Sequence, residues 1–471
     1  MKTIKHLLLA LSASFLLLSC TDWFDVSPGT QAKSSEMFQS EVGFRDALIG
    51  VYTIMARTSV YGAQATFANM DILAQYCSRE NTNRDVYDYE ESGRKSTIDA
   101  IWNTNYFAIA NCNNILDNID DKKEIFSTGI YEMVKAEAMA LRAFLHFDLL
   151  RFFGPIPISA NLSHPAIPVM TTLTNVPPRQ SSISEVVDFV LSELEEARKL
   201  IAPFDLLGPA FDEYEDEYSV TTFTPSNEHY DDGGFRLYRR SRFNYYGMTA
   251  LMARAALWTG RNSDALRYAN EVINSEKFPM TDENIYNTVG NFPRWCTANE
   301  YITSIYVNQM DTYEETASWF YNIILYNDSD MAVVFGSDMD FDWRYRRFIG
   351  TVSFGGWFIP IKYRNTGSRR MPLLKIGEMY LIAAEASGDI SYLNTLRAHR
   401  GYINNPLPAG TDLGVALTDE YRKEFLAEGQ LFSFYKRRNI SQFHNGIAAG
   451  AQVFVLPMPD SEIEFGNIIK D

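Results

Sequence analysis

Residues 131–158, YEMVKAEAMALRAFLHFDLLRFFGPIPI, constrain the fold more than any other stretch of the chain. Apolar residues recur there at helical spacing, and four of them fall on one line of the helix: Ala136, Ala140, Ala143 and Phe147. Small residues on such a line let a neighbouring helix approach closely, and the glycine and prolines at the end of the stretch stop the helix. The stretch therefore predicts a long helix packed among other helices.

The same periodicity recurs on both sides of this stretch. It predicts further helices at about residues 36–55, 96–119 and 182–202. In residues 243–275 a helix, a Thr-Gly turn and a second helix follow one another within about 34 residues, which is typical of a tetratricopeptide-like hairpin. One hairpin cannot bury its apolar face alone. We therefore expect it to stack on the helices at 131–153, 182–202 and 374–400.

Two segments without this periodicity interrupt the helical repeats. Residues 203–241 are acidic and contain glycine, and residues 277–372 hold short aromatic pieces between polar segments. The sequence thus predicts a mostly α protein, with a tetratricopeptide-like hairpin scaffold and a loop-rich part at about 277–372. We expect one domain over residues 20–471, with helical repeats at about 36–202, 242–276 and 373–437. Binding surfaces tend to lie on such loops.

The N-terminus has the pattern of a lipoprotein signal peptide. Two lysines precede an apolar run at 7–18, which is too short to span a bilayer because a spanning helix takes roughly 20 residues. Residues 17–20, LLSC, resemble a bacterial lipobox. We therefore expect residues 1–19 to be removed and Cys20 to carry the acyl chains; the alternative is an ordinary secretory signal. The acidic residues just after Cys20 resemble an export patch for lipoproteins on the outer face of the outer membrane.

Composition excludes several classes of site. The net charge of −17 disfavours nucleic acid, which requires a basic face. Besides Cys20, the cysteines are widely spaced and form no metal pattern and no evident disulfide framework: Cys77, Cys112 and Cys296. The sequence also contains no HExxH, no GxSxG and no phosphate-binding glycine loop. We expect no cofactor.

Two acidic runs leave a structural calcium ion open as an alternative. Asp338, Asp340 and Asp342 alternate like the first ligands of a calcium loop, but no glycine or later glutamate follows at the required spacing. The run at 212–217 is equally inconclusive. A solvated acidic loop is the favoured interpretation of both.

Several blocks resemble one family when they are read in order. They are the lipobox, AEAMALRAFLHFDLLRFFGPIPI (136–158), LLKIGEMYLIAAEA (373–386), LNTLRAHRG (393–401), EYRKEFLAEGQLFSFYKR (420–437) and VLPMPDSEIE (455–464). Together they resemble the SusD/RagB group of nutrient-binding outer-membrane lipoproteins. The resemblance implies a helical fold with tetratricopeptide-like hairpins and a partner, a TonB-dependent SusC-like barrel. It also implies delivery of oligosaccharides or, in some members, of peptides.

The chain departs from the family pattern in the helix at 420–437. Members commonly have an Arg and, three residues on, an Asp where this chain has Leu431 and Phe434. Replacing both charges by apolar groups is tolerable because neither is left buried alone. The resemblance in fold is therefore unaffected.

The candidate ligand contacts are aromatic. In the starch-binding prototype of the family, a Trp and an Asn of the early helix contact the glycan, and the resemblance carries these roles to Trp102 and Asn105. One helical turn places the two side chains together; the alternative is that both are structural. We also expect one or two tryptophans of the irregular part to line the site: Trp295, Trp319, Trp343 or Trp357. Trp258 lies within a predicted helix and is interpreted as core.

We expect a binding protein without catalytic activity. Glu424 and Glu428 lie on one helical face and could serve as acid and base in glycoside cleavage, but basic and aromatic neighbours favour structural ion pairs. Arg142 is likewise interpreted as a structural charge. The leading hypothesis is a surface-exposed, lipid-anchored protein that captures glycan and passes it to the SusC-like barrel. The alternatives are a surface glycoside hydrolase, a peptide-binding member of the family and a scaffold for envelope assembly.

Overall fold

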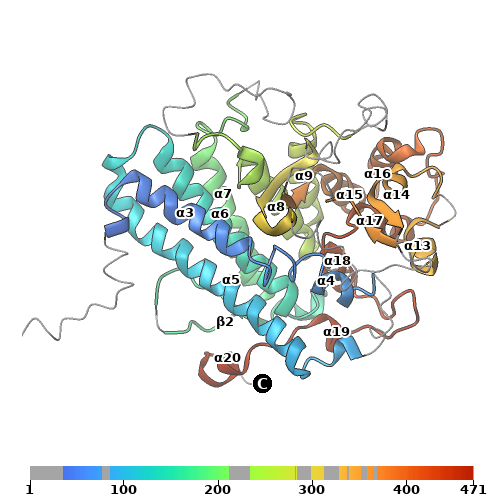
Figure 1. The fold of residues 1–471 in the computed structure, drawn as a ribbon, viewed down its shortest axis with the longest axis horizontal. Helices are drawn as coiled ribbons and strands as arrows, with labels where there is room; N and C mark the ends of the chain where they lie inside the picture. Colours follow the sequence, from blue (N-terminus) through green and yellow to red (C-terminus); the bar gives the residue numbers. More distant parts are fainter. Residues whose placement is uncertain are drawn as a thin grey trace, which may run out of the picture.

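The computed structural model describes residues 36–76, 85–174, 176–211, 234–281, 283, 299–311, 328–336, 339–351, 358–363 and 369–469. Helices dominate this part of the chain (Figure 1). The scaffold consists of α3 (Glu41–Met55), α5 (Ser92–Ile119), α6 (Ile130–Phe153), α7 (Ile183–Ile201), α8 (Tyr245–Trp258), α9 (Asn262–Ile273) and α15 (Ile376–Ser387). None of the described helices combines the length and apolar character needed to cross a bilayer. The signal peptide and Cys20 lie outside the described residues.

The scaffold helices pack in the order of the chain. Helix α5 packs on α3 and α6, α6 packs on α7, α7 on α8, and α8 on α9. Helix α15 then packs on α9, although residues 274–375 separate the two in sequence. The chain therefore leaves the helical stack after α9 and rejoins it at α15. The predicted mostly α fold with stacked helical hairpins is confirmed.

Helix α6 is the centre of the scaffold, as its sequence predicts. Every residue from Ala136 to Phe153 is buried. The polar side chains within it have specific partners: the Glu137 carboxylate pairs with Arg239 at 2.6 Å, and Arg151 pairs with Asp148 at 2.7 Å. Buried charges persist in such a core because each has a partner that offsets the cost of leaving water.

Local sequence signals set the ends of the helices. Ser182 begins α7 with a capping box, in which its Oγ accepts from the Glu185 N–H at 3.2 Å and Glu185 Oε2 accepts from the Ser182 N–H at 2.7 Å. Gly388 ends α15 with φ 73°, a left-handed conformation that suits glycine. The predicted helical stretch at 374–400 is therefore two helices, because this glycine turns the chain between them.

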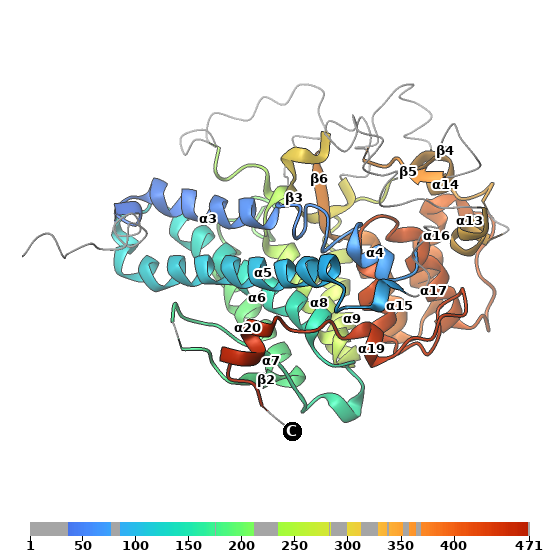
Figure 2. The ribbon, with the colours of Figure 1, turned by 60° about the horizontal axis from the view of Figure 1, so that its bottom comes forward.

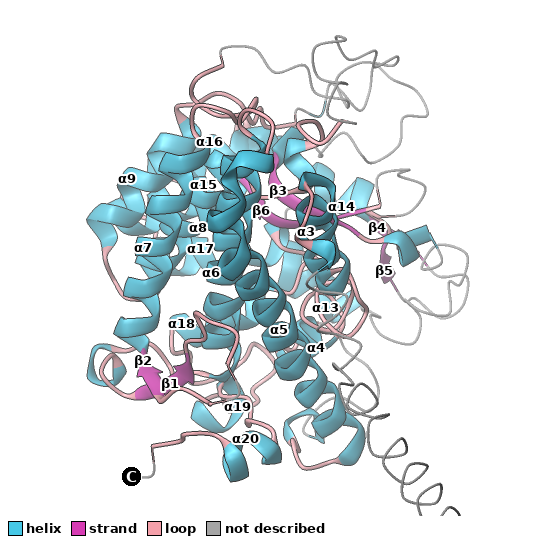
Figure 3. Cartoon of the chain, turned by 90° about the vertical axis from the view of Figure 1, so that its left-hand side faces the viewer, coloured by secondary structure: helices cyan, strands magenta, loops and turns pink. Residues whose placement is uncertain are grey.

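The described residues also contain shorter elements between and after the scaffold helices. Three antiparallel two-stranded ladders pair β1 (Pro165–Pro168) with β2 (Gln180–Ser182), β3 (Tyr301–Tyr306) with β6 (Arg370–Lys375), and β4 (Ile349–Thr351) with β5 (Phe358–Pro360). The short helices are α4 (Asn69–Leu73), α13 (Asp328–Phe335), α14 (Trp343–Phe348), α16 (Ile390–Arg397), α17 (Leu413–Glu424), α18 (Gln430–Arg437), α19 (Ala451–Phe454) and α20 (Asp460–Phe465). In the β3–β6 ladder Ile305 lies opposite Met371, and both are buried. Figure 3 shows how little of the fold is strand.

Candidate functional site

A hollow of about 290 Å³ lies beside α5. Its walls are α5, the loop between β1 and β2, and α20. Helix α20 runs close to α5 (Figure 2), and Lys95 of α5 pairs with Asp460 of α20 at 2.8 Å. Trp102 and Tyr106, one helical turn apart on α5, both line the hollow, and their ring centroids are 4.8 Å apart. Its remaining lining is mixed. The apolar residues are Ala110, Pro168, Met170, Leu173, Pro177 and Pro178, and the polar ones are Asn103, Asn113, Thr172, Thr174 and Glu462.

The loop wall of this hollow is held by side chains of α5. The Tyr106 hydroxyl donates to the carbonyl of Pro168 at 2.8 Å. The Asn113 amide donates to the carbonyl of Met170 at 3.1 Å, and Asp117 accepts from the Leu173 N–H at 3.1 Å. A loop fixed at several points along its backbone keeps its shape before ligand arrives. The hollow is therefore preformed.

Helix α6 fixes the same loop from beneath. The Met170 N–H donates to His146 Nε2 at 2.9 Å, so the proton of this imidazole resides on Nδ1, which donates to the carbonyl of Arg142 at 2.8 Å. Burial lowers the pKa of His146 to about 3, since a charged ring in this position would lose solvation. His146 is thus neutral and serves as a structural link between α6 and the loop.

Arg142 is a structural charge, as predicted. Its Nε donates to Glu193 of α7 at 2.9 Å, and its Nη1 donates to the Thr171 carbonyl and to Asn113 Oδ1, both at 2.9 Å. The guanidinium therefore joins α6, α7 and the loop wall of the hollow. It does not enter the hollow itself.

The structure brings Trp102 to the hollow but not Asn105. The Trp102 ring is only 3% exposed and packs edge-on against Phe153, with ring centroids 4.9 Å apart. Asn105 is 1% exposed; its amide donates to the Ile101 carbonyl at 2.9 Å and its Oδ1 accepts from Tyr61 at 3.3 Å. These two partners satisfy the amide of Asn105. Its role is therefore structural, which is the alternative that the sequence leaves open. The aromatic ring that shares the hollow with Trp102 is Tyr106, and the signal for it was the spacing of four residues on α5.

Of the four candidate tryptophans in the irregular part, only Trp343 lies within the residues that the structure describes. Trp343 has no exposed surface, and its Nε1 donates to the His399 carbonyl at 2.6 Å. A ring without exposed surface offers no face for a sugar, so Trp343 has a core role and is not one of the one or two tryptophans expected to line the site. Trp295, Trp319 and Trp357 lie outside the described residues. Trp258 is buried as predicted, with its ring edge-on to Phe147 at 6.0 Å.

The carboxylates of Glu424 and Glu428 are held in a buried ion network. Glu424 accepts from Arg344 at 2.7 Å and from Arg400 at 3.0 Å, and Glu428 accepts from Lys362 at 2.6 Å. Burial acts to raise the pKa of Glu424, but the charges of Arg400, Lys375 and Arg344 hold that pKa well below its usual value. The predicted structural ion pairs are confirmed.

This network also joins the loop-rich part to the C-terminal region. Lys375, at the end of β6, lies 2.9 Å from Glu428 and 3.3 Å from Glu424. Arg400 additionally binds Glu300, beside β3, at 2.7 Å. Residues from three separate parts of the chain therefore meet in one buried cluster.

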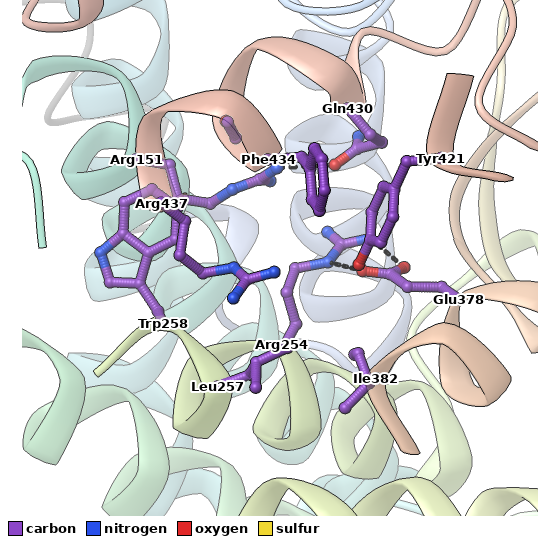
Figure 4. A pocket seen from close by; sticks show the side chains of 11 residues that line it. Arg151, Arg254, Leu257, Trp258, Glu378, Ile382, Tyr421, Gln430, Phe434 and Arg437 are labelled. Carbon is purple, nitrogen blue, oxygen red and sulfur yellow. Dashed lines mark hydrogen bonds and ion pairs between the residues drawn. The ribbon is translucent and has the colours of Figure 1, made fainter. Parts of the chain in front are cut away.

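A second cavity lies where α6, α8, α15, α17 and α18 meet (Figure 4). Its volume is about 30 Å³, enough for a water molecule and too small for a sugar ring. Three guanidinium groups line it, and each has an acidic partner: Arg151 with Asp148, Arg254 with Glu378 at 2.6 Å, and Arg437 with Glu385 at 2.6 Å. Figure 4 shows Arg254 directed toward Glu378 beneath the ring of Phe434. This cavity is a packed junction of the core.

One of the two apolar replacements in α18, Phe434, lines this junction. Phe434 stacks on Tyr421 with ring centroids 3.9 Å apart, and Leu431 is buried. Both positions are thus filled by buried apolar side chains.

The acidic run near 340 is engaged in protein contacts where it is described. Asp342 accepts from the Arg344 backbone at 3.0 Å and pairs with its guanidinium at 2.7 Å. Within the described ranges, no group of three metal-ligating side chains comes together. Asp338 and residues 212–217 lie outside those ranges, as do Cys77 and Cys296, whereas Cys112 is a buried free thiol.

Comparison with known proteins gives a consistent set of relatives. Residues 22–204 match the SusD-like family model described as starch-binding associating with outer membrane. A SusD superfamily protein of Bacteroides thetaiotaomicron superimposes with a TM-score of 0.70, at 18% identity, over 91% of this chain and 99% of the other. The chain is SusD-like in fold. The resemblance read from the sequence blocks is confirmed.

Further SusD-like relatives agree with this assignment. A SusD-like carbohydrate-binding protein of Bacteroides vulgatus superimposes with a TM-score of 0.68, at 18% identity, over 91% of this chain and 97% of that one. A laminarin-binding SusD-like protein gives a TM-score of 0.60, at 16% identity, over 92% and 99%. In sequence, a SusD-like protein of Formosa agariphila is 24% identical over 164 residues, which span 33% of this chain and 31% of that protein.

Proposed function

We propose that this SusD-like chain is a carbohydrate-binding lipoprotein of the outer membrane that captures oligosaccharide and delivers it to a SusC-like TonB-dependent transporter. Cys20 would carry the lipid anchor, and no bond would be made or broken in the cargo. The family model describes starch binding and association with the outer membrane, and one structural relative binds laminarin. These likenesses support the carbohydrate class of the ligand.

The preformed hollow beside α5 is the observation that carries this proposal. Sugar sites combine a flat aromatic surface with a few fixed polar groups. The hollow offers the ring of Tyr106, which is partly exposed, as its aromatic surface, and it has Asn103 and Glu462 among the polar residues of its lining. Its volume of about 290 Å³ suits a short glycan segment or chain end.

The buried ion network argues for binding without hydrolysis at the carboxylates singled out in the sequence. A glycosidase general acid must hold a proton near neutral pH, which requires a raised pKa. The pKa of Glu424 is instead held well below its usual value by three cationic neighbours, against the effect of burial. A carboxylate in this state accepts ion pairs and has no proton to donate.

The test is retention of the purified protein in native gels containing starch, laminarin, xylan or chitosan, followed by a reducing-end assay on the same mixtures. The proposal predicts retardation by at least one polysaccharide and no release of reducing ends over time. Steady release of reducing ends would support the surface hydrolase instead. Binding of a peptide mixture without retention by any glycan would support the peptide-binding alternative.

Partner delivery is tested separately by purification from the native envelope. Co-purification of a TonB-dependent barrel with the tagged protein is expected. Recovery of an envelope-assembly machine in place of a barrel would favour the scaffold alternative.

A further inference from the structure

The hollow beside α5 has one residue of a charged type among the described residues of its lining, and it is acidic. Glu462, on α20, contributes its carboxylate, and no Lys, Arg or His is among the described residues that line the hollow. The Glu462 carboxylate forms no ion pair or hydrogen bond with the described part of the chain. Its position is half-buried, and burial raises its pKa. A carboxylate that is partly desolvated and unpaired is stabilised by any cation that reaches it.

The neighbouring cations are already engaged. Lys95 of α5 pairs with Asp460 at 2.8 Å and lies 3.6 Å from Glu90. Arg142, behind the loop wall, binds Glu193. Neither of these two cations neutralises Glu462, and a cation that enters the hollow can pair with it.

The aromatic wall faces the same space. Tyr106 and Trp102 line the hollow together with Glu462. The pKa of the Tyr106 hydroxyl is raised mainly by burial and also by the negative charge of Glu462. Since that hydroxyl donates to the Pro168 carbonyl, it does not neutralise Glu462. An aromatic ring beside a free carboxylate is the arrangement that binds ammonium groups, through cation–π attraction and a charge-assisted hydrogen bond.

We infer that the hollow selects a glycan that carries a free primary amine, with the ammonium group of an amino-sugar ring held between Glu462 and the ring of Tyr106. This inference rests on the proposed carbohydrate-binding function and names the ligand class of that site. The Asn103 amide, which also lines the hollow, is placed to bond a ring hydroxyl. A lysine side chain of a peptide has the same ammonium chemistry, but it lacks ring hydroxyls for Asn103.

The test compares two oligosaccharides with one backbone. Calorimetric titration of the protein with chitosan hexamer, which carries free amines, is set against chitin hexamer, in which the amines are acetylated. We expect the wild-type protein to bind the chitosan hexamer at least about tenfold more tightly, a difference of about 1.4 kcal/mol. Glu462→Gln should abolish this preference. Glu464→Gln, a matched change at an exposed position of the same helix, should retain it.

A second variant tests the place of binding. Ala110→Phe adds a ring inside the hollow and should reduce chitosan affinity by at least about tenfold while the melting temperature stays near that of the wild type. Equal affinity of the wild-type protein for both hexamers would overturn the amine inference and leave the proposed function standing. Failure to bind any glycan in the gel panel would remove the proposed function as well. Tight binding of oligolysine that Glu462→Gln abolishes, without chitosan binding, would overturn the amino-sugar assignment.

Discussion

His146 Nε2 accepts a hydrogen bond of 2.9 Å from the Met170 N–H, and this contact joins the central helix α6 to the loop wall of the hollow. The bond requires a neutral imidazole, because a protonated ring has no acceptor. The rigidity of the hollow and the protonation state of His146 are therefore coupled.

The first prediction concerns acid stability. The pKa of His146 is about 3 in the folded protein against 6.5 as an ordinary value, so the unfolded chain binds the proton more readily between these limits. The stability from this group is fully present above pH 6.5 and is lost as pH falls toward 3, at up to about 1.4 kcal/mol per pH unit. Urea unfolding at pH 7, 6, 5 and 4 measures the loss. The slope should be shallower in His146→Gln, and an unchanged slope would contradict the assignment.

Lys436 should be a destabilising residue at neutral pH. It is fully buried; its Nζ donates only to the Phe152 carbonyl, at 3.2 Å, among the described residues, and burial together with the charge of Arg151 lowers its pKa well below the usual value. The unfolded chain gains a proton that the folded chain resists, so this cost is present below the ordinary pKa of 10.5 and shrinks as pH rises toward it.

Lys436→Met should therefore raise the melting temperature at pH 7 by a few degrees, roughly 1–2 kcal/mol. The Phe152 carbonyl keeps a donor in this variant, because the Leu456 N–H lies 3.1 Å from it. Lys199→Met, at an exposed position of α7, is the matched control and should leave the melting temperature unchanged. A lower melting temperature in Lys436→Met would show that the amine is stabilising.

Glu424→Gln should strongly destabilise the fold. The change removes the negative charge shared by Arg344, Arg400 and Lys375, and leaves these buried cations underpaired. The expected loss is about 3–5 kcal/mol in the free energy of unfolding, measured by urea denaturation at pH 7. Glu195→Gln, which alters a partly exposed ion pair on α7, should cost less than about 1 kcal/mol. Equal effects of the two changes would contradict the role of the network.

Trp102→Ala should lower stability, in contrast to the behaviour of an exposed ligand contact. The ring is almost completely buried against Phe153, so its removal leaves a cavity that costs about 3–5 kcal/mol. The melting curve of this variant measures the loss. A nearly unchanged curve would show that the ring is peripheral and would return it to the role of an exposed stacking surface.

The sequence was most informative where periodicity was long and regular. The buried helix at 131–153 and the hairpin at 243–275 were both predicted close to their observed bounds, because each depends on contacts local in sequence. The sequence predicts that α15 stacks on the helical hairpin that contains α9, because hairpins of this type stack on one another. It does not predict the path of residues 274–375 between the two helices. The sequence predicts that Glu424 forms structural ion pairs, but it does not identify the partners as Arg344, Lys375 and Arg400.

The site was less accessible to sequence reasoning. Helical spacing placed Trp102 and Asn105 on one face, whereas the structure directs Asn105 to Tyr61 in the core and pairs Trp102 with Tyr106. Glu462 joins these rings from a short helix more than 350 residues away in sequence, and no local pattern links such distant positions. Composition also could not predict that Trp343 is buried, because aromatic residues suit cores and binding surfaces alike.

The most direct test of the account is a crystal structure of the protein soaked with an oligosaccharide that retains it in the gel panel. The account predicts a sugar ring in the hollow beside α5, in contact with Tyr106 and within hydrogen-bond distance of Glu462, with the glycosidic bonds intact. The account would be contradicted by electron density for a sugar at another place with none in this hollow. A cleaved glycan in the hollow would contradict it as well.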